Sequence, residues 1–115
     1  MSWSRQVLGC SQAAEQLAAQ GVQAEVMDLR TIWPWDQAAV LASVAKTGRL
    51  LVVHEAVQVA GFGAEIAATV AEQTGAKLAR LGAPRIPVGY APTLEAEARV
   101  DAGQIVDAAQ RLVRR

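Results

Sequence analysis

The chain has 115 residues, of which 52% are hydrophobic, and this length supports one core and therefore one domain, residues 1–115. Lysine plus arginine and aspartate plus glutamate balance at 11 each, which argues against a nucleic-acid or membrane partner, because either would need a clustered basic surface. The single cysteine, Cys10, excludes an internal disulfide, and one cysteine with one histidine cannot form a zinc-ligand cluster within one copy. Neither a signal-peptide pattern nor an 18-residue apolar run is present, so we expect a cytoplasmic protein.

The first third of the chain predicts a helix, a strand and a second helix. From residue 5, apolar side chains recur at the spacing of one helical face: Val7, Cys10, Ala14 and Leu17. Gly21 ends this run, and residues 23–29 favour a strand. Pro34 keeps the next residues in a loop, and Asp36 is placed to accept hydrogen bonds from the first amides of a helix that Gly48 ends.

Residues 50–53 form an unbroken aliphatic run, typical of a strand buried on both faces of a parallel sheet. His54 and Glu55 follow it directly. A helical period comes next, carried by Phe62, Ile66 and Val70. In open α/β sheets, ligands and partners are met at the carboxyl ends of the strands, so His54 and Glu55 lie where chemistry could occur.

The last third predicts a strand at residues 77–81, a surface connection and a final helix. Residues 82–93 hold three prolines and two glycines, which rules out a central strand. Asp101 and Gln104 form a capping-box-like pair ahead of an amphipathic helix. Helices that alternate with strands predict an α/β domain with helices on both faces of its sheet.

Two glycines around Phe62 suggest an anion or nucleotide site, because exposed amides at a helix start attract anions. The candidate residues are Gly61, Phe62, Gly63 and Ala64. Neither complete phosphate-loop pattern is present, and the alternative is that the glycines let the helix start pack closely.

His54 and Glu55 are neighbours on an extended segment, so their side chains point to opposite sides and need not form an acid–base pair. No nucleophile elbow is present, and we expect no catalytic residue; an interface or hydrogen-bonding role for His54 is favoured. Trp33 and Trp35 either cover the domain's own core or anchor a partner. The candidate interface residues are Trp33, Trp35, His54, Glu55, Phe62, Arg85 and Tyr90.

Four blocks resemble, in order and spacing, the transketolase C-terminal-type domain found in the β subunit of thiamine-diphosphate-dependent 2-oxoacid dehydrogenases. They are residues 28–36 (DLRTIWPWD), 46–56 (KTGRLLVVHEA), 61–66 (GFGAEI) and 82–84 (GAP). The resemblance implies a three-layer α/β/α domain with a mostly parallel sheet of about five strands, one edge strand being antiparallel. Residues 2–4 are expected to be the end of a truncated first edge strand, and the family's N-terminal half lies outside this sequence, as in an excised or separately encoded section.

The complete enzyme that the resemblance implies binds thiamine diphosphate and magnesium between the α subunit and the N-terminal domain of the β subunit. It decarboxylates a 2-oxoacid and passes the acyl group to a lipoyl group. This domain is then expected to bind no cofactor, to hold together the α subunit and the second β subunit of an α2β2 assembly, and to dock on the subunit-binding domain of the dihydrolipoyl acyltransferase. Residues 30–36 resemble branched-chain enzymes more than pyruvate enzymes, whereas Arg85 and Gly89 depart from the family pattern. The alternatives are an anion- or nucleotide-binding regulatory module and an independent enzyme that uses His54.

Overall fold

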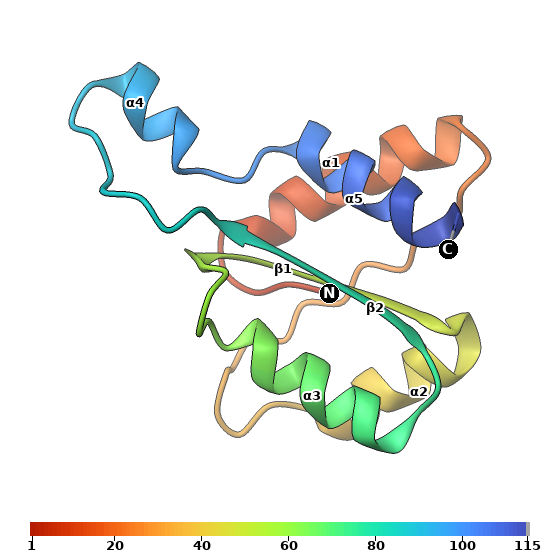
Figure 1. The fold of residues 1–115 in the computed structure, drawn as a ribbon. Helices are drawn as coiled ribbons and strands as arrows, with labels where there is room; N and C mark the ends of the chain where they lie inside the picture. The colour runs from red at the N-terminus through yellow and green to blue at the C-terminus, as the bar shows by residue number, and fades with distance from the viewer. Residues whose placement is uncertain (115) are drawn as a thin grey trace.

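The computed structural model describes residues 1–114 and arranges helices on both faces of a parallel sheet (Figure 1). Helices α1 and α5 cover one face, and α2 and α3 cover the other, which gives the three-layer α/β/α arrangement that the sequence predicts. The elements in chain order are α1 (Gln6–Ala19), α2 (Gln37–Thr47), β1 (Arg49–Val57), α3 (Gly63–Gln73), β2 (Lys77–Ala83), α4 (Pro92–Glu97) and α5 (Ala102–Arg114).

The predicted strands at residues 50–53 and 77–81 are confirmed as the centres of β1 and β2, which pair in parallel. The register runs from Arg49 opposite Lys77 to Val53 opposite Leu81. Alternate residues of β1 belong to different core clusters, one against α2 and α3 and the other against α1 and α5. The aliphatic run is continuous because both faces of the strand are covered.

Residues 1–3 lie along the other edge of β1 and run in the same direction. The Met1 α-amino group donates a hydrogen bond to the Leu51 carbonyl oxygen at 2.9 Å. The Val53 amide donates to the Met1 carbonyl oxygen at 3.0 Å. Residues 1–3 also bond to residues 27–29 on their other side. The segment therefore lies between β1 and residues 27–29, and not at the edge of the sheet, where the sequence predicts a truncated strand.

The strand predicted at residues 23–29 is present only at its carboxyl end. The Ser2 amide donates to Met27 O at 2.9 Å, the Leu29 amide donates to Ser2 O at 3.0 Å, and Ser2 forms an isolated parallel bridge with Asp28. Within residues 1–114, no backbone amide of residues 23–28 donates a hydrogen bond. A strand requires a ladder with a neighbour, and within residues 1–114 no strand lies beside residues 23–26.

The sheet is consequently smaller than the five strands that the family resemblance implies. The described residues contain two regular strands, both parallel, together with the bridge between residues 2 and 28, and they contain no antiparallel edge strand. None of the helices in this part of the chain is long and apolar enough to cross a lipid bilayer.

The predicted helix ends are confirmed by their hydrogen bonds. Asp36 accepts from the Ala39 amide at 3.0 Å at the start of α2, and Gly48 ends that helix with a left-handed φ of 66°. Ahead of α5, the Gln104 amide donates to the Asp101 carboxylate at 2.8 Å, and the Asp101 amide donates to the Gln104 side chain at 3.0 Å.

One local expectation needs correction. The buried face of α1 includes Ala13 in place of Ala14, and it also buries Gln6, whose side-chain amide donates to the Val100 carbonyl oxygen at 3.0 Å. Residues 92–97 form a short helix, α4, which starts at Pro92. Proline is favoured in the first turn of a helix because the amide it lacks would be unpaired there.

Candidate functional site

His54 lies near the carboxyl end of β1 and is fully buried, with 0% of its surface exposed. Its Nδ1 lies 2.9 Å from the Ala56 carbonyl oxygen. Because a carbonyl can only accept, Nδ1 carries the proton and Nε2 is the unprotonated nitrogen. Nε2 is buried and has no hydrogen-bond partner in the described part of the chain.

Three glycines surround the His54 ring. A Cβ atom on Gly61 would lie 2.8 Å from the ring, and one on Gly63 or on Gly82 would lie 2.7 Å from it. Such distances are well inside van der Waals contact, so a side chain at any of the three positions would displace the imidazole. Two of these glycines are those that the sequence places at the candidate anion site; Gly82, at the end of β2, is a third that sequence analysis did not connect with His54.

Trp3 covers the remaining face of the imidazole. The two rings are nearly parallel, at an interplanar angle of 18° with centroids 5.3 Å apart. The Phe62 ring meets Trp3 edge-on at 6.1 Å. His54 therefore joins the N-terminal segment to β1, β2 and the start of α3, and no sequence motif around Trp3 indicates this contact.

Burial lowers the pKa of His54, and the positive charge of Arg80 lowers it further, although the hydrogen bond to Ala56 opposes both effects. The imidazole is consequently neutral near pH 7. Glu55, the next residue, is exposed, so the two side chains do not form an acid–base pair. The imidazole is thus neutral, fully buried and separate from the Glu55 carboxylate.

The helix start at residues 61–64 is also crowded. The Ala64 amide already donates to the Gly61 carbonyl oxygen at 2.9 Å, and the His54 ring occupies the space beside Gly63. The Gly61 amide also donates, to the Gln58 carbonyl oxygen at 3.4 Å. Close packing against His54 accounts for the glycines without a ligand.

The candidate interface residues fall into two groups. His54 and Phe62 face the interior, and Trp35 is half-buried against the core cluster of α2, α3 and β1. Trp33 is 80% exposed, and Tyr90 is fully exposed. Of the two tryptophans, Trp35 therefore packs against the core, whereas Trp33 is exposed.

Comparison with known proteins identifies a matching family model and similar curated proteins. A family model described as "Transketolase, C-terminal domain" matches residues 1–105. The chain is 40% identical over 119 residues to a mitochondrial pyruvate dehydrogenase E1 component subunit beta of Dictyostelium discoideum, covering 100% of this chain and 33% of that protein. It is 47% identical over 73 residues to a mitochondrial 2-oxoisovalerate dehydrogenase subunit beta 2 of Arabidopsis thaliana, covering 64% of this chain and 20% of that protein.

A solved structure titled "Split gene transketolase, inactive beta4 tetramer" has the same fold, with a TM-score of 0.89 at 22% sequence identity. The match covers 98% of this chain and 38% of that one. The chain thus spans about a third or less of the two curated relatives.

The close packing around Gly63 predicts that two glycine-to-alanine substitutions differ greatly in their effect on the free energy of unfolding. Gly63→Ala places its Cβ against the His54 ring and 3.1 Å from Val52 Cγ1, so we expect a loss of about 1–3 kcal/mol in the free energy of unfolding. The matched control is Gly75→Ala, where a Cβ meets nothing within 4 Å. Urea denaturation of both variants measures the difference, and equal stabilities would contradict the packing.

The buried neutral imidazole predicts a specific pH dependence of stability. The pKa of His54 is lowered from 6.5 in the folded state, so the unfolded chain binds more protons and stability falls as pH drops below about 6.5. One proton contributes a slope of at most about 1.4 kcal/mol per pH unit. His54→Asn removes the titrating group and keeps a donor for Ala56; unfolding at pH 7, 6 and 5 should show a shallower slope than in the parent. Equal slopes of stability against pH in the parent and in His54→Asn would show that the pKa of His54 is the same in the folded and unfolded states.

Proposed function

Because the chain belongs to the transketolase C-terminal domain family, we propose that it is the assembly and docking domain of a thiamine-diphosphate-dependent 2-oxoacid dehydrogenase β subunit. Relatives that carry β-subunit names support this assignment. The observation that carries the proposal is the contrast between a histidine enclosed by packing and large apolar side chains left exposed at the carboxyl end of the sheet. Such a surface suits contact with proteins better than chemistry on a substrate.

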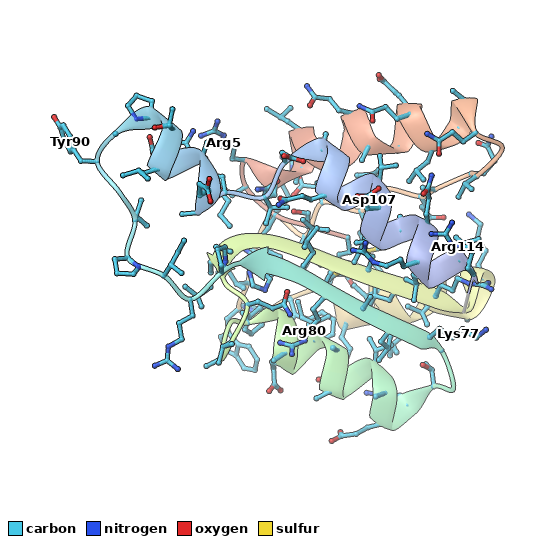
Figure 2. All side chains as sticks on the ribbon, turned by 45° about the horizontal axis from the view of Figure 1, so that its top comes forward. Arg5, Lys77, Arg80, Tyr90, Asp107 and Arg114 are labelled. Carbon is cyan, nitrogen blue, oxygen red and sulfur yellow. The ribbon has the colours of Figure 1, made fainter. Side chains whose placement is uncertain are left out.

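Several exposed apolar side chains lie on the segment of residues 84–97, here termed the arm. The arm leaves the end of β2 and projects away from the three layers (Figure 1). Tyr90 lies near its tip and points away from the body (Figure 2). The exposed apolar residues of the arm are Ile86, Val88, Tyr90 and Leu94. The aromatic anchor and its aliphatic neighbours have the composition expected of an interface.

Trp33 adds a second exposed anchor in the loop between residue 30 and α2. That loop is held locally: the Thr31 hydroxyl donates to the Pro34 carbonyl oxygen at 2.9 Å, and Asp28 pairs with Arg30 at 2.7 Å. Internal hydrogen bonds already order this loop, so less conformational entropy is lost when Trp33 binds a partner. Tryptophan is also among the residues most enriched at binding hot spots.

In this proposal the partners are the α subunit and second β subunit of an α2β2 assembly and the subunit-binding domain of the dihydrolipoyl acyltransferase. Thiamine diphosphate and magnesium are held elsewhere in the enzyme. The enclosure of His54 supports this part of the proposal, because the buried imidazole is not available to a bound group. A branched-chain 2-oxoacid is favoured as substrate by residues 30–36 and supported by the 2-oxoisovalerate dehydrogenase relative.

The proposal predicts that the isolated chain does not turn over substrate. Purified chain is mixed with thiamine diphosphate, magnesium, a branched-chain 2-oxoacid or pyruvate, and an artificial electron acceptor. We expect no rate above that of buffer, because His54 is buried and cannot act as a general acid or base on a substrate. A rate proportional to chain concentration would overturn the proposal.

The docking role predicts that Trp33→Ala weakens association without loss of stability. Titration calorimetry against the α subunit and against the acyltransferase subunit-binding domain should show a loss of more than about 1 kcal/mol in binding for at least one partner. The control is Val113→Ala, a 42% exposed residue on α5. Unchanged affinity together with a lower melting temperature would show that Trp33 supports the fold instead.

A further inference from the structure

The extended segments of the sheet lie in an order that differs from their order along the chain. Residues 1–3 lie between β1 and residues 27–29, and β2 lies on the other side of β1. After residues 1–3 the chain enters α1 on one face of the sheet, whereas after β1 it enters α3 on the opposite face (Figure 1). Where the connections of two neighbouring strands leave toward opposite faces, a crevice opens at the carboxyl ends of the strands, and open α/β sheets bind ligands there.

A pocket of about 530 Å³ lies at this crevice, and we call it the switch pocket. Arg5 and Gln6 line it directly after the first extended segment, and Glu55 lines it near the carboxyl end of β1. The arm forms a further wall through Val88, and Arg5 lies beside α4 in Figure 2. Three segments that the topology brings together therefore build the pocket.

Five charged side chains line the switch pocket, and three of them are already engaged. Glu95 pairs with Arg99, and Asp101 caps the start of α5. Arg5 and Glu55 form no ion pair within residues 1–114. The pocket thus presents one positive and one negative group to a ligand.

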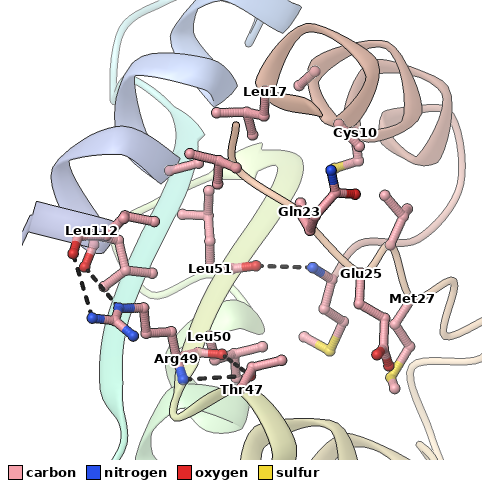
Figure 3. A pocket seen from close by; sticks show the side chains of 18 of the residues that line it. Cys10, Leu17, Gln23, Glu25, Met27, Thr47, Arg49, Leu50, Leu51 and Leu112 are labelled. Carbon is pink, nitrogen blue, oxygen red and sulfur yellow. Dashed lines mark hydrogen bonds between the residues drawn. The ribbon is translucent and has the colours of Figure 1, made fainter. Parts of the chain in front are cut away.

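A second pocket, at the amino end of the sheet, differs in this respect (Figure 3). It has a volume of about 460 Å³, and it lies between residues 21–27 and β1. Its lining is mainly apolar. Its Glu25 carboxylate bonds to Lys46 at 2.5 Å, and its Arg49 side chain donates to the Leu112 carbonyl oxygen at 3.3 Å. Among the described residues, this second pocket therefore has no unengaged charged side chain.

The start of α1 adds positive charge to the switch pocket. This helix has no side-chain cap and no acidic residue in its first turn. The amides of Arg5 and Gln6 donate no hydrogen bond within the described residues. Unpaired amides at a helix start carry partial positive charge, and together with the Arg5 guanidinium they suit a carboxylate.

The Gln6 side chain supplies a hydrogen-bond acceptor. Only 7% of the residue is exposed, and its Nε2 donates to the Val100 carbonyl oxygen at 3.0 Å. Its Oε1 accepts no hydrogen bond within the described residues, and the space beside it is open because Gly9 has no side chain: a Cβ there would lie 3.0 Å from Oε1. Gln6, Gly9 and Val100 all line the pocket. A ligand ammonium can donate to Oε1 while the Glu55 carboxylate balances its charge.

Aliphatic side chains complete the lining, namely Leu8 on α1 and Val88 on the arm, and both are exposed. We propose that the switch pocket binds an aliphatic α-amino acid, with its carboxylate at Arg5 and the start of α1 and its ammonium at Glu55 and Gln6 Oε1. The side chain of the ligand lies against Leu8 and Val88 and removes apolar surface from water. This inference concerns the ends of the strands and does not depend on the proposed dehydrogenase role.

The test titrates L-leucine into the isotope-labelled whole chain and follows the backbone amides by NMR. We expect the signals of Gln6 and Glu55 to shift and to saturate with a single Kd, and the signal of Gly75, which lies outside the pocket, to stay unchanged. Two analogues each remove one charge: isocaproate lacks the ammonium, and isoamylamine lacks the carboxylate. At equal ionic strength each should bind about ten-fold more weakly than leucine, because each loses a charge-assisted contact.

Two variants remove the complementary charges from the protein at exposed positions, Arg5→Gln and Glu55→Gln. Each should raise the Kd for leucine about ten-fold. The matched control is Arg85→Gln, at an exposed residue of the arm outside the pocket, which should leave the Kd unchanged. Melting temperatures verify that each variant is folded, and the analogue comparison on the parent chain decides the outcome if one is not.

Four results would overturn the proposal. Equal affinity for isocaproate and leucine would show a site for anions, and equal affinity for isoamylamine and leucine would show a site for cations. The absence of saturable shifts at Gln6 and Glu55 would show that leucine does not bind there. Unchanged affinity for leucine in either charge-removal variant would show that the charge does not contact the ligand.

Discussion

The packing of the His54 ring against Trp3 and three glycines fixes how four separate segments of the chain meet. A neutral imidazole can fill this space because one nitrogen bonds to the Ala56 carbonyl and the glycines leave room for the ring. The cost is a second nitrogen that is buried without a partner. The start of α3 and the carboxyl ends of β1 and β2 meet at this contact.

Much of the fold could be predicted from local sequence because local physics decides it. Residues 50–53 are aliphatic without interruption since both faces of β1 are covered. Asp36 and the pair formed by Asp101 and Gln104 act within one turn of the chain, so their spacing alone identifies the helix starts. Gly48 ends α2 in the left-handed conformation that glycine adopts most readily.

What the sequence could not predict depends on contacts between distant segments. Residues 23–29 have the composition of a strand, yet a ladder forms only where Ser2 lies beside Asp28. The meeting of Trp3, Gly82 and His54 spans nearly 80 positions, and no local pattern encodes it. Exposure is equally non-local: Trp33 and Trp35 are separated by one proline, but one is exposed and the other packs against the core.

The arm has a consequence for how this domain can change over evolution. It is joined to the body at β2 and α5, and its apolar side chains point to solvent, so they contribute little to the free energy of unfolding. Substitutions there leave the core and the His54 packing as they are. Under the proposed docking role, partner choice and foldability are therefore encoded by different residues, and binding specificity can change while the core packing that holds the scaffold together stays the same.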